Sequence, residues 1–320
     1  MQKKYLLLIL LLLLVGCKEH KRTSPVNNVI IRNGHVYYYI KGLKKSFCVL
    51  FLADTHFTVE DERGREFYKY SKRMGGEAVE PENYGVGNGR DRALEASLDK
   101  ARKTNCELVL LGGDIVNFPS LASVERLKKL LDSSGLNWMY ISGNHDWHYE
   151  GELGKASDQR EKWTNKHLKA LYQGNSPMFC SQVIGGVNFV MIDNSIFEII
   201  PEQLEFFQEQ IQRGIPILLS VHIPLFQPGH GVDYGCGNPY WMRANDCYFE
   251  VERREPWSEK GCSKTTLQFR ECVMCNPEVI GVYAGHMHDE AIDFFNGKLQ
   301  YVVDANFNGE DVLIHFLPVE

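Results

Sequence analysis

The sequence predicts an α/β protein with a sheet whose strands end in polar side chains of the kind that bind ligands. Apolar runs of strand length occupy residues 46–53, 107–111 and 137–141. Between them, residues 91–104 and 121–131 carry apolar side chains at helical spacing, so strands and helices alternate along the chain. This alternation is typical of α/β folds, in which the carboxyl ends of the strands share one edge and ligands gather there.

The N-terminus has the features of a bacterial export signal. Two lysines precede an unbroken apolar run at residues 5–15, which is shorter than the roughly 20 residues that span a bilayer. The following letters, LVGC, end at Cys17 and resemble the lipobox of bacterial lipoproteins. We therefore predict a signal peptide at residues 1–16 and a lipid anchor on Cys17. The protein would then be extracytoplasmic and lipid-anchored to a bacterial membrane, facing the periplasm or the cell surface. An uncleaved anchor or a plain secretory signal is the alternative.

The chain after the leader begins with a polar segment. Residues 17–28 contain a proline and no apolar periodicity, which predicts a tether. The remaining chain, 44% apolar overall, is long enough for a substantial core. Within it, residues 57–90 fill with glycine and charge, which predicts a long insertion before the helix at 91–104. Asp91 is the expected cap of that helix.

The second half of the sequence continues the pattern and then changes it. Residues 186–193 and 215–221 predict strands, with a helix around 202–211 between them. Residues 226–276 interrupt the pattern with aromatic residues, charges and cysteines, and predict a second insertion. Short strands without intervening helices follow at residues 279–284, 291–295, 299–303 and 312–316.

The cysteines concentrate in the second insertion. Five of the eight that follow Cys17 lie there: Cys236, Cys247, Cys262, Cys272 and Cys275. In an exported protein this density predicts disulfides. A structural zinc site that uses Cys272-x-x-Cys275 is the alternative. Because five is an odd number, one of these cysteines would stay free or pair outside the group.

The charge balance bears on the ligands of the protein. The formal net charge is −6, and removal of a leader that contains two lysines makes the mature chain more acidic. No basic run predicts a nucleic-acid-binding face. An acidic protein that binds an anionic substrate needs another source of positive charge, and a bound metal would supply it.

Five polar clusters stand at the ends of five predicted strands. They are Asp54-x-His56, Gly113-Asp114, Gly143-Asn144-His145-Asp146, His222 and Gly285-His286-Met287-His288. Taken alone, an aspartate after a strand is usually a turn or cap residue, and a single histidine is seldom a ligand. Taken together, these clusters bring carboxylates, an amide and imidazoles, flanked by glycines, to one sheet edge.

These residue types suit the hydrolysis of a phosphoester. Attack on phosphorus requires a nucleophile at neutral pH and neutralisation of the charge on the non-bridging oxygens. Two metal ions roughly 3.5–4 Å apart can supply both. Such a site needs mixed oxygen and imidazole ligands and one bridging carboxylate. The glycines keep side chains away and permit unusual backbone angles in the turns that bear ligands.

In this order, the motifs D-x-H, G-D, G-N-H-D, H and G-H-x-H resemble those of the calcineurin-like metallophosphoesterase superfamily. They run from Asp54 to His288, so the resemblance covers most of the mature chain. It implies a metal-dependent hydrolase with a sandwich of two mixed β-sheets flanked by helices, in four layers of αββα order. Because ligands so far apart in sequence must meet, one domain is expected over residues 29–320, with the insertions at 57–90 and 226–276.

The resemblance also implies a role for each motif residue. Seven side chains would bind two divalent metal ions, which would be Mn, Fe, Zn or Mg. One ion would be held by Asp54, His56 and His288, the other by Asn144, His222 and His286, and Asp114 would bridge them.

Two further residues would act on the leaving group. While a metal-bridging hydroxide attacks phosphorus, His145 would protonate the leaving group as the general acid. Asp146 would fix the imidazole of His145 and favour its protonated form.

The sequence departs from the protein-phosphatase branch of the superfamily after Asp114. That branch continues with an aspartate, an arginine and a glycine that clamp a phosphomonoester, whereas this chain reads Ile-Val-Asn-Phe-Pro. We therefore predict a small-molecule substrate of phosphodiester or nucleotide type. A scavenging phosphomonoesterase is one alternative. A surface-binding lipoprotein that keeps the metals without turnover is another, although such a protein has no physical reason to retain the acid His145.

Both insertions leave from strand ends that bear ligands, so we expect them to overhang the site. Four cations of the first insertion would meet a second phosphate or remain solvated: Arg65, Lys72, Arg73 and Arg90. Aromatic residues of the second insertion would stack on a base or sugar, or form the small core of a disulfide-stapled lid. They are Tyr240, Trp241, Tyr248 and Phe249.

Overall fold

The computed structural model describes residues 23–231, 234–239, 250–251, 255–256 and 261–319. Several predictions fall outside this part of the chain and stay predictions. They concern the signal peptide, the lipid attachment at Cys17, the first half of the tether, and residues Tyr240, Trp241, Cys247, Tyr248 and Phe249. Within the described ranges, no helix combines the length and the apolar character that a membrane span requires.

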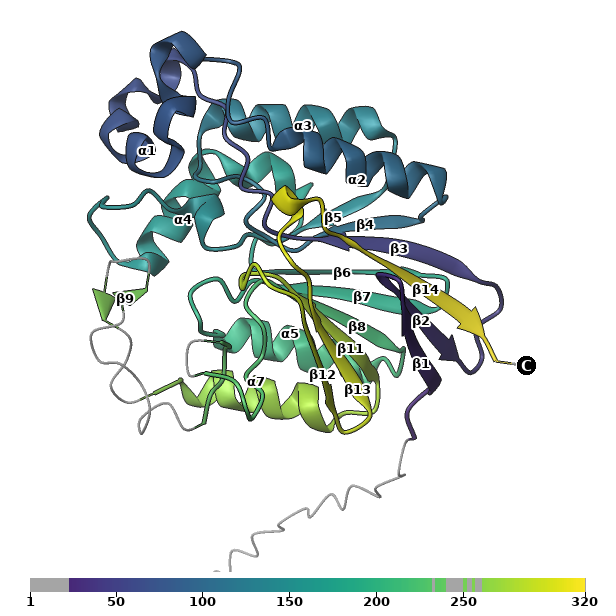
Figure 1. Cartoon of the computed structure of the whole chain (residues 1–320). Coiled ribbons are helices and arrows are strands. Elements are labelled where there is room, and N and C mark those ends of the chain that lie inside the picture. Colours follow the sequence, from purple (N-terminus) through teal and green to yellow (C-terminus); the bar gives the residue numbers. More distant parts are fainter. Residues whose placement is uncertain (1–22, 232–233, 240–249, 252–254, 257–260, 320) are drawn as a thin grey trace, which may run out of the picture.

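Two mixed six-stranded β-sheets lie at the centre of the molecule (Figure 1). The first has the order β1 (Val26–Arg32), β2 (His35–Ile40), β14 (Val312–Pro318), β3 (Phe47–Leu52), β4 (Leu108–Leu111) and β5 (Trp138–Tyr140). The second has the order β12 (Ala291–Phe295), β13 (Lys298–Val302), β11 (Val279–Ala284), β8 (Ile217–Val221), β7 (Val187–Ile192) and β6 (Phe179–Ile184). A separate short pair joins β9 (Glu250–Val251) to β10 (Glu255–Pro256).

Each sheet contains a block of parallel strands. In the first sheet β3, β4 and β5 are parallel, and in the second β7, β8, β11 and β13 are parallel. Parallel neighbours need crossover connections. Helices α2 (Asp91–Lys103), α3 (Leu121–Ser134), α5 (Pro201–Gln212) and α7 (Lys264–Cys275) lie in these connections. The parallel blocks therefore bring the carboxyl ends of β3, β4, β5, β8 and β11 to corresponding edges of the two sheets.

The helices complete a four-layer αββα sandwich. Figure 1 shows α2 and α3 over the outer face of the first sheet, and α5 and α7 over the outer face of the second. Strand β3 is buried on both faces, because Val49 and Phe51 belong to the apolar cluster between the sheets, and Leu50 and Leu52 to the cluster under the helices. Burial on both faces explains the continuous apolar run in this strand. The predicted fold class is confirmed.

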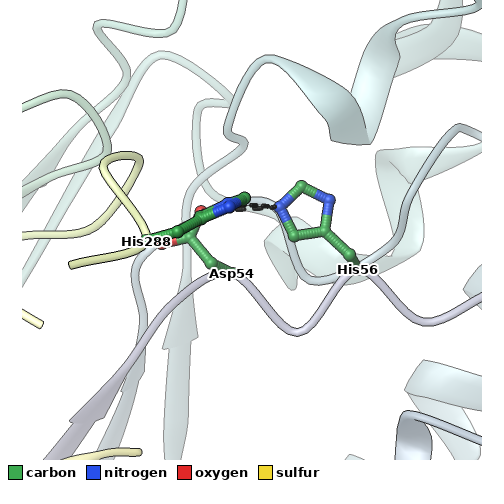
Figure 2. Close-up of side chains that lie close together, drawn as sticks. All are labelled: Asp54, His56 and His288. Carbon is green, nitrogen blue, oxygen red and sulfur yellow. Dashed lines mark hydrogen bonds and ion pairs between the residues drawn. The ribbon is translucent and has the colours of Figure 1, made fainter. Parts of the chain in front are cut away.

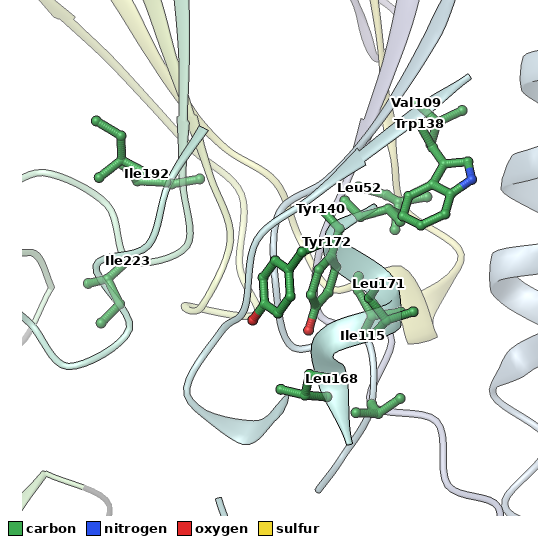
Figure 3. Packing of buried hydrophobic residues seen from close by; sticks show 14 of the residues in the cluster. Leu52, Val109, Ile115, Trp138, Tyr140, Leu168, Leu171, Tyr172, Ile192 and Ile223 are labelled. Atoms are coloured by element: carbon green, nitrogen blue, oxygen red, sulfur yellow. The ribbon is translucent and has the colours of Figure 1, made fainter. Parts of the chain in front are cut away.

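The apolar cluster under the helices also anchors the loop that follows β5 (Figure 3). The rings of Tyr140 and Tyr172 pack at a centroid distance of 5.3 Å. The Ser142 hydroxyl lies 2.5 Å from the Tyr172 hydroxyl and 3.3 Å from that of Tyr140. These contacts fix the loop one residue before the Gly143-Asn144-His145-Asp146 motif.

Several elements differ from the sequence-based expectation. Strand β1 begins at Val26, inside the expected tether, and pairs with β2. The first insertion contains a short helix, α1 (Tyr68–Gly75), and a further helix, α4 (Ala156–Lys166), follows the GNHD motif. The N-cap of α2 is Arg90, and Asp91 lies in the first turn, where its carboxylate accepts hydrogen bonds from the Arg126 guanidinium of α3.

The described cysteines form no disulfide. Seven are free: Cys48, Cys106, Cys180, Cys236, Cys262, Cys272 and Cys275. The disulfide-stapled insertion expected from the sequence is therefore not found within the described ranges. The zinc alternative gains no support either, because no cluster of potential metal ligands in the described part of the chain includes a cysteine.

Candidate metal centre

The five motif segments meet where the two sheets face each other at their carboxyl edges. The backbone N–H of Asp54 donates to the Gly113 carbonyl oxygen at 3.0 Å, and the backbone N–H of His56 donates to the backbone carbonyl oxygen of Asp114 at 2.9 Å. The N–H of Gly285 donates to the His222 oxygen at 3.0 Å. These bonds join the loops after β3 and β4, and those after β8 and β11, so the polar side chains converge at one place.

The loops hold their polar residues in an unusual backbone conformation. Five expected ligands have φ angles between 46° and 73°, in the left-handed region: Asp54, His56, Asp114, His286 and His288. Residues other than glycine rarely adopt this region, and such strain concentrates at functional sites because the surrounding structure enforces it. The motif glycines allow the close approach of these loops. A Cβ atom on Gly285 would collide with the Asp54 carboxylate.

Asp54, His56 and His288 form the first ligand group (Figure 2). The Nε2 atoms of His56 and His288 lie 3.0 Å apart, a spacing that two neighbouring ligands of one ion adopt when metal–nitrogen bonds are about 2.1 Å. The Oδ1 atom of Asp54 lies 3.5 Å from His288 Nε2 and 3.7 Å from His56 Nε2. This oxygen is buried and has no hydrogen-bond partner among the described residues. A buried carboxylate oxygen of this kind is stabilised by a nearby positive charge, which a metal ion or a protonated imidazole can provide.

Asn144, His222 and His286 form the second group. The Oδ1 atom of Asn144 lies 3.1 Å from His222 Nε2, and the rings of His222 and His286 pack at a centroid distance of 5.2 Å. His222, His286 and Asp114 offer ligand atoms that all lie within 4.8 Å of one another. The two imidazoles, the amide oxygen and a carboxylate form the mixed donor set that suits a divalent transition metal.

Asp114 lies between the two groups. Its Oδ2 atom is 3.2 Å from His222 Nε2 and 3.6 Å from His56 Nε2, so one oxygen faces histidines of both groups. Its Oδ1 atom accepts the backbone N–H of His145 at 2.7 Å. This arrangement suits a carboxylate that contacts two ions at once.

Hydrogen bonds on the far side of two imidazoles orient them toward the site. The Nδ1 atom of His222 lies 3.0 Å from the Gly112 carbonyl oxygen, to which it donates. The Nδ1 atom of His56 is 3.3 Å from Asn117 Oδ1. A proton on Nδ1 leaves Nε2 with a free lone pair, which is the form that binds metal.

The charges of the site favour cations. Burial by itself would raise the pKa of Asp114, but the neighbouring histidines, His222 first, hold it well below its usual range. Although burial favours the neutral imidazole of His222, the Asp114 carboxylate raises its pKa to about 10. Burial and the charge on His222 lower the pKa of His286 to about 3. Without metal, a proton on His222 therefore balances Asp114, and bound ions would displace that proton.

His145 lies beside these ligands. Its ring meets that of His56 edge to face at a centroid distance of 4.5 Å, and its Nδ1 atom is 3.2 Å from the Asn117 carbonyl oxygen. That bond leaves Nε2 available for a proton that can be donated. His145 also forms a potential ligand cluster with His56 and Asp114.

Asp146 has different partners from those expected. Its buried carboxylate accepts the backbone N–H groups of Gly143 at 2.8 Å, Asp114 at 2.8 Å and Val116 at 2.9 Å. No hydrogen bond joins it to the His145 ring, whose Nδ1 atom is held by Asn117 instead. Burial and the nearby Asp114 charge raise the pKa of Asp146 to about 7. Asp146 therefore ties together the two loops that carry Asp114 and Asn144.

We expect Asp146→Ala to destabilise the fold and to weaken metal binding. The change leaves three buried N–H donors without an acceptor, at about 1–3 kcal/mol each, so the free energy of unfolding should fall by roughly 3 kcal/mol or more. Urea unfolding and metal analysis would measure this. Asp146→Asn, which keeps one acceptor oxygen, should lose less. Unchanged stability in the alanine variant would contradict the structural role.

Sequence reasoning missed Asn117. This residue contacts His56 through its side chain and His145 through its carbonyl oxygen, and its amide nitrogen donates to the Met74 oxygen at 2.8 Å. Its position three residues after Asp114 carries no motif signal, because an asparagine in a loop is usually a turn residue.

This fold and this ligand geometry together define a metallophosphoesterase. Residues 48–290 match the calcineurin-like phosphoesterase family, and the chain belongs to that family. It is a metal-dependent phosphoester hydrolase of a family that binds a dinuclear divalent centre.

Solved structures are similar to the chain at low sequence identity. A dimetal phosphatase from Danio rerio is 12% identical, with a TM-score of 0.51 over 82% of this chain and 89% of its own. A phosphopantetheinyl hydrolase from Mycobacterium tuberculosis is 10% identical, with a TM-score of 0.43 over 82% of this chain and 91% of its own. No curated protein sequence matches the chain significantly.

Proposed function

We propose that this protein hydrolyses a phosphodiester or nucleotide-type phosphoester at a dinuclear metal centre. The observation that carries the proposal is the position of Asp114 Oδ2, which lies 3.2 Å from His222 Nε2 and 3.6 Å from His56 Nε2. A shared carboxylate between two histidine-containing groups is the arrangement that holds two ions as a pair.

Seven residues would hold the ions. Asp54, His56 and His288 would bind one, Asn144, His222 and His286 would bind the other, and Asp114 would contact both. The bound pair would supply a hydroxide at neutral pH and neutralise charge on the phosphoryl oxygens. Asn117 and Gly112 hold the Nδ1 atoms of His56 and His222, which would leave the Nε2 atoms free to bind the ions.

His145 is proposed to protonate the leaving group. Its backbone N–H is held by Asp114 and its Nδ1 atom by the Asn117 carbonyl oxygen. The ring is therefore fixed beside the ligands, with Nε2 as its proton donor. Protonation of a poor leaving group at this position is worth roughly 10²–10⁴-fold in rate.

The segment after Asp114 supports a diester over a phosphoprotein. Ile115 and Val116 are fully buried in the apolar core and offer no charge to a phosphomonoester dianion. Asn117 is the next residue, and its amide is already bonded to His56 and to the Met74 oxygen. A substrate with one charge on the scissile phosphate needs less neutralisation than a dianion.

The test compares bis-p-nitrophenyl phosphate with p-nitrophenyl phosphate. Protein stripped with chelator and reloaded with Mn²⁺, Zn²⁺ or Mg²⁺ should hydrolyse both, with a larger kcat/KM for the diester, and stripped protein should be inactive. A larger kcat/KM for the monoester would indicate a scavenging phosphatase. If metal-loaded protein hydrolyses no phosphoester but binds methylphosphonate tightly, the chain is a binding protein and the proposal is wrong.

A further inference from the structure

Arg90 of the first insertion differs from Arg65 and Lys72 in its surroundings. Arg65 pairs with Glu62 at 3.5 Å, and Lys72 is bonded to Glu80. Arg90 makes no ion pair with any described residue, although the protein is acidic overall. An exposed guanidinium without a carboxylate partner is available for an anionic ligand.

Asn88 fixes the segment that carries Arg90 to a metal-ligand loop. Its side-chain Oδ1 accepts the N–H of Thr58 at 3.0 Å and the N–H of Arg90 at 3.1 Å. Its Nδ2 donates to the His56 carbonyl oxygen at 3.0 Å. These hydrogen bonds tie the end of the first insertion to the loop that carries His56.

Phe307 fixes the direction of the Arg90 side chain. The guanidinium carbon lies 4.3 Å from the centre of the Phe307 ring. The same ring meets His288 edge to face at 5.2 Å and His56 at 5.9 Å. The backbone N–H of Phe307 donates to the backbone carbonyl oxygen of Asp54 at 3.2 Å. This bond anchors the ring to the first ligand group. The charge of Arg90 is thus held one aromatic ring away from two metal ligands.

We propose that Arg90 binds a second anionic group of the substrate, next to the scissile phosphate. The guanidinium, His56 and His288 all contact the Phe307 ring. Arg90 itself lies outside the ligand set of the ions, because a guanidinium has no lone pair to offer a metal. A planar guanidinium binds two oxygens of one phosphate through parallel hydrogen bonds. The substrate class is then a phosphoester with a neighbouring phosphate, as in a diphosphate linkage. This inference rests on the proposed phosphoester site, of which it defines the specificity.

The test measures binding, so that it does not depend on turnover. Methylphosphonate carries one phosphoryl group and methylenediphosphonate carries two, and neither has a phosphoester bond. Their dissociation constants for Mn²⁺-loaded protein are measured by calorimetry at a fixed excess of Mn²⁺, with metal content checked afterwards. Arg90→Ala should raise the dissociation constant of methylenediphosphonate roughly 10- to 100-fold, which is the loss expected for a charge-assisted contact. The dissociation constant of methylphosphonate should change less than about twofold.

Two further variants sharpen the result. Arg90→Lys keeps the charge without the planar fork, so its affinity should lie between those of wild type and Arg90→Ala. Arg102→Ala removes the same charge from the opposite end of α2, where Arg102 pairs with Asp99, and should leave both ligands unaffected.

Three results would overturn the inference. They are equal weakening of both ligands by Arg90→Ala, no effect on either ligand, and no preference of wild-type protein for the diphosphonate. Selective weakening in a protein that hydrolyses nothing would support Arg90 as a phosphate-binding residue while refuting the proposed activity. Hydrolysis of phosphodiesters without any effect of Arg90→Ala on binding would support the proposed activity and refute the role of Arg90.

Discussion

Asp114→Ala is expected to abolish metal binding at both positions and to reduce phosphodiester hydrolysis by roughly 10³-fold or more, which corresponds to about 4 kcal/mol of transition-state stabilisation. The reason is that Asp114 Oδ2 faces His222 of one group and His56 of the other. The loss of one carboxylate therefore weakens the binding of two ions, and the His222 imidazole loses the anion that raises its pKa. Elemental analysis of the purified variant and kcat/KM for bis-p-nitrophenyl phosphate would measure both effects.

Thermal unfolding gives an independent measurement for the same variant. Metal at about 100 times its dissociation constant stabilises a folded protein by about 2.7 kcal/mol, so added Mn²⁺ should raise the Tm of wild-type protein and not that of Asp114→Ala. Asp132→Ala, which removes an exposed carboxylate paired with Lys128 on α3, should retain both the metal and the shift in Tm. An Asp114→Ala protein that still binds two ions per chain would exclude Asp114 as the bridging ligand.

His145→Ala is expected to keep the metals and to lose activity according to the leaving group. Hydrolysis of a diester with a poor leaving group, such as a phenolate, should slow by roughly 10²–10⁴-fold, whereas a p-nitrophenolate ester should be much less affected. The physical reason is that a good leaving group departs as an anion and needs no proton. Rates for a series of aryl diesters would show a steeper dependence on leaving-group pKa in the variant than in wild type.

The metal content of His145→Ala is the critical control, because His145 also lies within ligand distance of His56 and Asp114. Loss of an ion would identify His145 as a ligand, and equal slowing of good and poor leaving groups would remove it from the role of acid. His315→Ala, which removes an imidazole from β14 that contacts His35, is the matched histidine variant and should behave like wild type.

The sequence predicted the strands that are buried on both faces better than it predicted the others. Strand β11 was expected at residues 279–284 and lies there, and β3 differs from its expected run by one residue at each end. Continuous apolar runs of this kind have few alternatives to a buried strand. Strand β1 was missed because its exposed residues alternate with half-buried ones, and its pairing with β2 provides the order that its local sequence does not.

The identity of the candidate ligands could be predicted from the sequence alone, and the roles of their neighbours could not. Aspartate, asparagine and histidine after successive strands have few structural reasons to occur together, and parallel strands bring their ends to one edge. Asp146, Asn117 and Arg90 act through partners that are distant in the chain. Val116 lies 30 positions from Asp146 and His145 lies 28 positions from Asn117, and the partner of Arg90 is Phe307. A hydrogen bond to a distant backbone N–H cannot be predicted from the local residue pattern, and neither can a contact with a distant aromatic ring.

The sequence by itself therefore determined the α/β class, the metal-binding residue types and the phosphoester chemistry, because these depend on local periodicity and on the donor atoms of side chains. Only the tertiary structure decided that Asp146 holds loops together, that Asn117 orients two imidazoles, and that Arg90 is held on Phe307 beside the site. The physical reason is that hydrogen bonds and cation–π contacts are directional and short-ranged. Their partners are set by how the two sheets and the first insertion pack, which no single segment encodes.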